Sequence, residues 1–155
     1  MPRKRARRSA PKEDQALGNF RDGFNCSQSV LSAFSRELGL PPRTGHRLSQ
    51  AFGGGLARTG RVCGAVTGAL MVLGLEYGKR TAKDDAARDK TYALSREFMR
   101  RFKARHGSLD CRSILGHDLG TPRGAAAIKR KNLHKTVCEK LVKDAVQILE
   151  RLPKK

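Results

Sequence analysis

The sequence has few of the features that proteins use to read nucleic acid. Its 155 residues include no tryptophan and two tyrosines, while 33 basic residues outnumber 14 acidic ones, giving a formal net charge of +19. That charge favours contact with phosphates. However, there is no zinc-finger spacing and no aromatic-studded sheet motif to stack bases. These absences argue against sequence-specific recognition and leave nonspecific attraction to polyanions.

Targeting and membrane-spanning segments are also missing from the pattern. The N-terminus lacks the apolar region of a secretory signal. The apolar stretch Gly60–Leu75 is shorter than the about 20 residues that a bilayer requires, and it contains several glycines. We therefore expect a cytoplasmic protein.

The first residues of the chain are strongly basic and include almost no large apolar side chain. The segment MPRKRARRSAPKE contains six basic residues and one acidic residue, and beyond Met1 nothing apolar larger than alanine. Such a segment cannot bury enough surface to offset the entropy of ordering it. We predict a disordered basic tail over residues 1–18, able to bind polyanions nonspecifically, and a helical four-cysteine domain over residues 19–155.

No part of the chain alternates with a strand period, whereas helical spacing recurs throughout. The apolar segment Gly60–Leu75 has no polar face, which is typical of a helix in the middle of a bundle. Its Gly64 and Gly68 share one side and would allow a neighbouring backbone to approach closely. We predict an all-α fold, a single bundle of about five helices around this buried central helix. The other expected helices cover residues 25–38, 47–52, 82–105, 111–115 and 133–152.

The four cysteines, Cys26, Cys63, Cys111 and Cys138, contain no CxxC pair, which excludes a thioredoxin-type motif and a zinc ribbon. A single cysteine in an apolar helix is usually a small core residue. Three of these four, however, lie near a predicted helix start, where the macrodipole lowers the pKa of a thiol. The fourth, Cys138, lies on a buried arc one turn after His134, close enough for that imidazole to act as a base or donor.

Cys63-Gly64-Ala65-Val66-Thr67-Gly68, with one cysteine upstream and two downstream, resembles the C_GCAxxG_C_C family of redox-active proteins. The similarity extends from about Phe20 to Leu152 and includes NCSQSV around the first cysteine and DCRSILGHDL around the third. Members of the family are small and often encoded near transporters, so the resemblance implies a redox partner and a transporter-associated function. Related domains lie beside haem in split-Soret cytochromes, where an iron–sulfur centre has been suspected.

We therefore expect redox chemistry by the four cysteines, exchanging between dithiol and disulfide, with Cys63 as the nucleophile. Four cysteines permit three pairings, and the sequence does not choose among them. The resulting activity would be that of a thiol–disulfide oxidoreductase, although the sequence leaves open whether the protein is an enzyme. It also gives neither the redox partner nor the oligomeric state.

Two other interpretations remain open at this point. The same four residues, Cys26, Cys63, Cys111 and Cys138, could ligate a metal centre, either [2Fe–2S] or zinc, although their wide spacing is unusual for such a site. The glycines from Gly53 to Gly60 could offer backbone N–H groups to an anion. No Gly-Lys-Ser/Thr follows them, and we expect a plain turn between helices instead.

Overall fold

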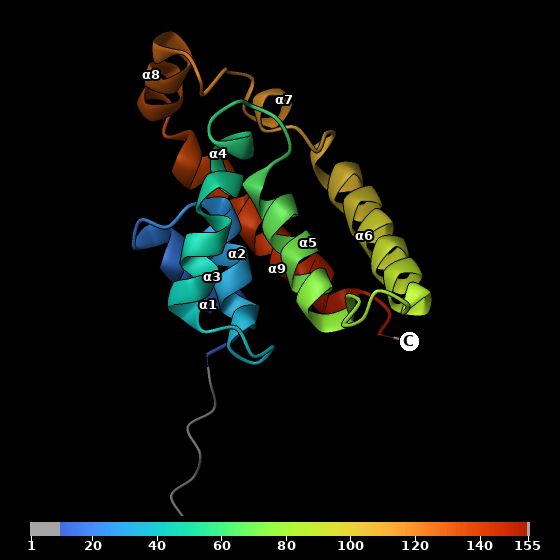
Figure 1. The fold of residues 1–155 in the computed structure, drawn as a ribbon. Helices are drawn as coiled ribbons and strands as arrows, with labels where there is room; N and C mark the ends of the chain where they lie inside the picture. Colours follow the sequence, from blue (N-terminus) through green and yellow to red (C-terminus); the bar gives the residue numbers. More distant parts are fainter. Residues whose placement is uncertain (1–9, 155) are drawn as a thin grey trace, which may run out of the picture.

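The computed structural model describes residues 10–154, and all regular structure in that range is helical (Figure 1). One isolated antiparallel bridge joins Val62 to Asp110. The predicted all-α class is therefore confirmed for these residues. In chain order the elements are α1 (Lys12–Arg21), α2 (Cys26–Ser35), α3 (Pro42–Ser49), the 3-10 turn η1 (Gln50–Phe52), α4 (Gly53–Leu56), α5 (Gly64–Tyr77), α6 (Asp85–His106), α7 (Cys111–Leu115), α8 (Pro122–Arg130), the π-helical turn η2 (His134–Cys138) and α9 (Glu139–Arg151).

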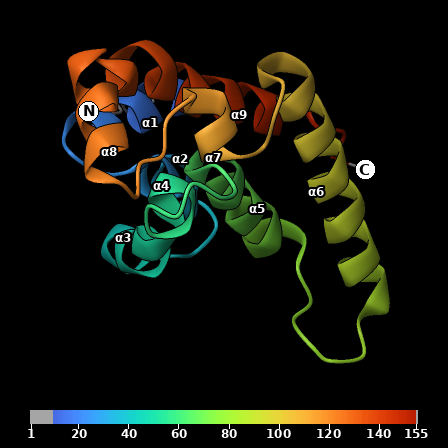
Figure 2. The same cartoon turned by 90° about the horizontal axis from the view of Figure 1, so that it is seen from above.

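The long helices lie side by side around a common core. Helix α6 runs along one side, α1 to α3 lie on the other, and α5 and α9 lie between them in both views (Figures 1 and 2). Helix α2 packs against α1, α3, α5 and α9, and α6 packs against α5 and α9. The shorter elements α4 and α7 contact each other near the start of α5.

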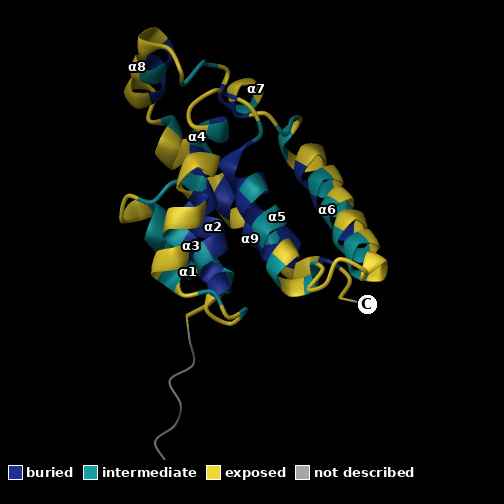
Figure 3. Ribbon diagram, viewed as in Figure 1, coloured by how far each residue is buried: buried dark blue, intermediate teal, exposed yellow. Residues whose placement is uncertain are grey.

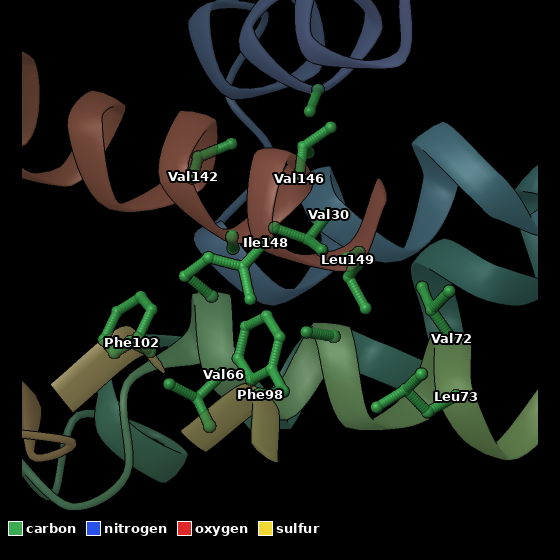
Figure 4. Close-up of a cluster of buried hydrophobic side chains, with 14 of the residues drawn as sticks. Val30, Val66, Val72, Leu73, Phe98, Phe102, Val142, Val146, Ile148 and Leu149 are labelled. Carbon is green, nitrogen blue, oxygen red and sulfur yellow. The ribbon is translucent and has the colours of Figure 1, made fainter. Parts of the chain in front are cut away.

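Buried apolar side chains from four helices fill the space between them (Figures 3 and 4). Phe98 and Phe102 of α6 are fully buried, with ring centroids 6.0 Å apart. Helix α9 contributes the broad apolar arc that the sequence predicted for the last helix. The other large, fully buried apolar side chains of this core come from α2, α5 and α9: Val30, Leu31, Val66, Val72, Val142, Val146 and Ile148.

Helix α5 is apolar, but it is not buried on every side. Its glycine face contacts α2: a Cβ on Gly68 would lie 2.7 Å from the carbonyl oxygen of Ser27, so no larger residue fits. Elsewhere on the helix Leu70, Met71 and Leu75 are only partly buried. The close approach predicted at the glycines is therefore present, whereas the predicted count of about five helices and the fully buried central helix are not confirmed.

Capping explains why α2 begins at Cys26. The Asn25 side chain accepts a hydrogen bond from the Gln28 N–H (3.0 Å), and the Gln28 side chain accepts one from the Asn25 N–H (2.9 Å). This reciprocal pair satisfies two amides that the first turn would leave without partners. It also fixes the position of the first cysteine at the start of the helix.

The boundary predicted for the tail is wrong for residues 12–18, because α1 begins at Lys12. Its buried Ala16 and partly buried Leu17 and Phe20 pack against the rest of the bundle, and Arg21 forms an ion pair with Glu139 of α9 (3.0 Å). This apolar spacing could have predicted the helix. Residues 1–9, the most basic part of the expected tail, lie outside the described residues.

Helix α8 also went unpredicted, in a segment expected to be a loop. Thr121 caps it by accepting a hydrogen bond from the Gly124 N–H (3.0 Å), and Pro122 is its first residue. Both are recognised helix-start signals. Between residues 10 and 154, no helix combines the length and the apolar character needed to cross a membrane.

Candidate functional site

The four cysteines come from four separate elements and line one cavity of about 490 Å³. Cys26 begins α2, Cys63 precedes α5, Cys111 begins α7 and Cys138 ends η2. All four are free thiols; Cys26 is partly buried and the other three are buried. The convergence that the redox interpretation requires is therefore present. Other lining residues are Phe20, Gly23, Asn25, Gln50, Ala51, Gly53, Gly54, Ala57, Arg58, Gly64, Leu115, Leu119, His134 and Leu141.

Two backbone hydrogen bonds bring Cys63 and Cys111 together. The Cys63 N–H donates to the Leu109 carbonyl oxygen and the Cys111 N–H to the Arg61 carbonyl oxygen, each at 2.7 Å. These bonds flank the Val62–Asp110 bridge. In an antiparallel pair, this register makes the two cysteines diagonal neighbours on the same face.

The missing side chain of Gly64 allows Cys26 to approach this pair. A Cβ on Gly64 would lie 3.1 Å from the Cys26 Cβ and 3.0 Å from the Ser27 amide nitrogen. Both distances are tighter than ordinary packing contacts. The small residue after Cys63 therefore makes room for a second cysteine, as the sequence predicted.

Cys138 has two hydrogen-bond donors beside it, which distinguishes it from the other cysteines. Hydrogen bonding with the neighbouring Cys26 thiol and His134 imidazole outweighs burial and lowers the pKa of Cys138 to about 6. The same contact raises the pKa of His134. His134 is exposed and lies at the start of η2, a π-helical turn of a kind often found at functional sites. At neutral pH the arrangement favours a thiolate–imidazolium pair.

The pKa values of the other three thiols are raised instead of lowered. Burial raises the pKa of Cys63 to about 12 and that of Cys111 to about 11. The hydrogen bond to Cys138 and burial raise the pKa of Cys26 well above its usual value. The prediction that Cys63 would be the low-pKa nucleophile is therefore wrong. The Ala65 and Val66 amides at the start of α5 do reach its sulfur, but loss of solvation outweighs them.

A run of left-handed backbone forms one wall of the cavity. Gly54 and Gly55 have positive φ, as do Leu56, Ala57 and Arg58, with φ between 53° and 67°. For residues with a Cβ this conformation costs about 1–2 kcal/mol each. Internal hydrogen bonds hold the run in place: the Ala57 N–H donates to the Ala51 carbonyl oxygen (2.8 Å), and the Thr59 hydroxyl donates to the Gly55 carbonyl oxygen (2.8 Å). The glycines thus form a turn, as expected, but its backbone is in the left-handed conformation.

Four cysteines are a suitable donor set for zinc or an iron–sulfur cluster. Among residues 10–154, however, no three His, Cys, Asp or Glu side chains are grouped closely enough to hold a metal ion. The thiols as arranged therefore do not fit a ligated metal. No step of the chemistry below involves one.

Sequence reasoning did not find Arg58 or the apolar residues Leu115 and Leu119, which also line the cavity. They lie in segments expected to be a turn, a short helix end and a loop. No periodic signal marks such positions. His134, by contrast, was identified from its spacing to Cys138.

Comparison with known proteins identifies a family. A family model described as "Putative redox-active protein (C_GCAxxG_C_C)" matches residues 24–152. No curated protein and no solved structure matches the chain. The matched range contains all four cysteines of the cavity and most of the chain. This protein therefore belongs to the C_GCAxxG_C_C family.

Proposed function

We propose that this protein carries out thiol–disulfide exchange, with Cys138 as the attacking residue and Cys26 as the resolving residue. The observation that supports this most directly is that Cys26, Cys138 and His134 line one cavity together with the other two cysteines. The effect of Cys26 on the pKa of Cys138 agrees with this placement. An attacking cysteine must be a thiolate and must have a second thiol within reach. Cys138 is the thiolate, and Cys26 is the second thiol.

In the proposed reaction the Cys138 thiolate attacks one sulfur of a substrate disulfide. A mixed disulfide forms, the substrate S–S bond breaks, and the leaving thiolate takes a proton from the His134 imidazolium. Cys26, after losing its proton to the neutral imidazole, then attacks the Cys138 sulfur. The second half of the substrate leaves as a thiolate and is protonated by solvent. The substrate gains two electrons and the protein becomes a Cys26–Cys138 disulfide.

Cys63 and Cys111 are the remaining pair. They are diagonal neighbours across the bridge between residues 62 and 110, and a disulfide between them would require the backbone to move. With pKa values of about 12 and 11 they stay protonated at neutral pH and would react after Cys138. Turnover as a thiol–disulfide oxidoreductase would require a reducing thiol from a partner protein or a small molecule. Such chemistry suits a reducing compartment such as the cytoplasm.

The test is to add one equivalent of a small disulfide to the fully reduced protein and to map the products by mass spectrometry. We expect the first intramolecular disulfide to join Cys26 and Cys138. Cys26→Ser should instead accumulate a mixed disulfide on Cys138, and Cys138→Ser should slow the reaction. Cys63→Ser is the matched control and should still give the first disulfide. If the wild type keeps four free thiols, or oxidises first between Cys63 and Cys111, the proposal fails.

A second candidate, a Cys-ligated [2Fe–2S] or zinc centre, is favoured by the same gathering of four sulfur donors. It would require the side chains to move closer together, since no three donors are grouped now within residues 10–154. Colour and metal analysis of protein purified without oxygen test it directly. A colourless, metal-free sample would leave thiol–disulfide exchange as the function.

A further inference from the structure

Apart from the Cys138 thiolate, the charge that borders the four-cysteine cavity is positive. None of the lining residues is acidic, whereas Arg58 is cationic and His134 can become so. Among the described residues, Arg58 forms no ion pair and its side chain makes no hydrogen bond. Its guanidinium is therefore available to a ligand.

The local backbone directs Arg58 toward the cavity. Arg58 is the last of the consecutive left-handed residues that begin at Gly54. A Cβ on Gly54 would lie 3.1 Å from the Arg58 Cγ and 3.3 Å from the Leu119 Cδ2, so the arginine stem lies across a glycine that lines the cavity. Its positive charge is near enough to lower the pKa of His134, against the effect of Cys138. The arginine therefore acts at the reacting end of the site.

We propose that the cavity selects small disulfides and thiols that carry a negative charge, and that Arg58 determines this specificity by binding the anionic group. The inference rests on the proposed thiol–disulfide exchange. A thiolate at Cys138 repels an approaching anion, so an anionic substrate requires compensating positive charge. A guanidinium is well suited to a carboxylate, which it can bind through two parallel hydrogen bonds. The cavity of about 490 Å³ is of a size that small molecules occupy.

Three disulfides of similar size but different charge test the proposal. Dithiodipropionate is anionic, hydroxyethyl disulfide is neutral and cystamine is cationic. The readout is the rate at which each oxidises the reduced protein, followed by loss of free thiol at low ionic strength. We expect the wild type to react fastest with the anion. In Arg58→Ala the ratio of anionic to neutral rates should fall by about tenfold, the lower range for electrostatic steering, whereas Arg58→Lys should retain part of it.

Arg123→Ala is the matched control. It removes the same charge from an exposed position on α8 that does not line the cavity, and it should leave the ratio of rates unchanged. The proposal is overturned if the wild type shows no preference among the three disulfides, or if Arg58→Ala lowers all three rates by the same factor. A loss of preference in Arg123→Ala equal to that in Arg58→Ala would also overturn it, because net charge would then explain the result.

The neutral disulfide separates this inference from the proposed function. If hydroxyethyl disulfide produces the Cys26–Cys138 bond but charge has no influence, the exchange reaction stands and the anion specificity fails. If no disulfide in the series produces that bond, the exchange reaction itself fails. Circular dichroism of each variant confirms that the helices remain folded.

Discussion

The two halves of the helical bundle differ in the regularity of their backbone and in their packing. In the regular half, α2, α5, α6 and α9 pack through helical faces with large, fully buried side chains (Figure 4). The cysteine end consists of a left-handed turn, a two-residue bridge, a five-residue helix and a π-helical turn. Its apolar cluster, around Ile128 and Leu115, is smaller, and several close backbone contacts there depend on glycines.

This difference separates stability from chemistry. The regular half buries apolar surface, which provides most of the driving force for folding. The irregular half turns the chain so that sulfurs from distant positions meet, and it holds backbone conformations that are unfavourable by themselves. We infer that the packed half compensates for strain at the cysteine end. The predictions below test whether the two halves can be altered independently.

The largest effect is expected in the packed half, from Phe98→Ala. Phe98 is fully buried between α6 and the rest of the core, and truncating a buried phenylalanine costs about 3–5 kcal/mol. Denaturant unfolding should show this loss. Under conditions where the variant remains folded, the alkylation rate of Cys138 should match that of the wild type. A large change in that rate would mean that the two halves are not independent.

A smaller effect is expected where the halves meet, at the glycines of α5. Gly68→Ala would place a methyl group 2.7 Å from the Ser27 carbonyl oxygen, and such overpacking costs about 1–3 kcal/mol. Gly74→Ala, in the same helix, meets nothing within 4 Å and should stabilise the protein by about 0.5–1 kcal/mol through helix propensity. The pair is compared by thermal unfolding. Equal effects of the two substitutions would contradict close packing of α2 on α5.

The smallest expected effect is a change in the pKa of Cys138, at the cysteine end. His134→Gln removes one of the two hydrogen-bond donors to Cys138, whose pKa they lower to about 6. The alkylation rate should therefore reach its midpoint at a higher pH, by about one unit. The other groups near Cys138 are Cys26, Cys63 and Cys111, with Arg58 beyond the imidazole.

The pH dependence has a definite sign. Because the pKa of Cys138 is depressed, the wild type loses its thiolate as the pH falls through about 6. In His134→Gln the thiolate should be lost at a higher pH. Measuring iodoacetamide incorporation into Cys138 across this range checks the shift. His117→Gln, outside the cavity, serves as the control. An unchanged midpoint in His134→Gln would show that Cys26 alone sets the pKa.

The regular half was largely predictable from the sequence, because periodic apolar spacing specifies α2, α6 and α9, and an uninterrupted apolar run specifies α5. The site was predictable only in its residue types: four cysteines and His134 were identified. Which thiol would be reactive depended on burial and on the Cys26–Cys138 contact, neither of which is a local property. Arg58 was not identified as a site residue, because a left-handed conformation at a residue other than glycine has no local sequence signal.

The wide separation of Cys26 and Cys138 along the chain has one further consequence. A disulfide between them would close a loop of about 110 residues, and a cross-link of that span can restrict the unfolded chain by about 4–5 kcal/mol. Oxidation would then make the protein harder to unfold and slower to be degraded. The relationship is reciprocal: folding favours the disulfide by the same free energy, so the midpoint potential of the pair would be lower in the folded protein than in the unfolded chain.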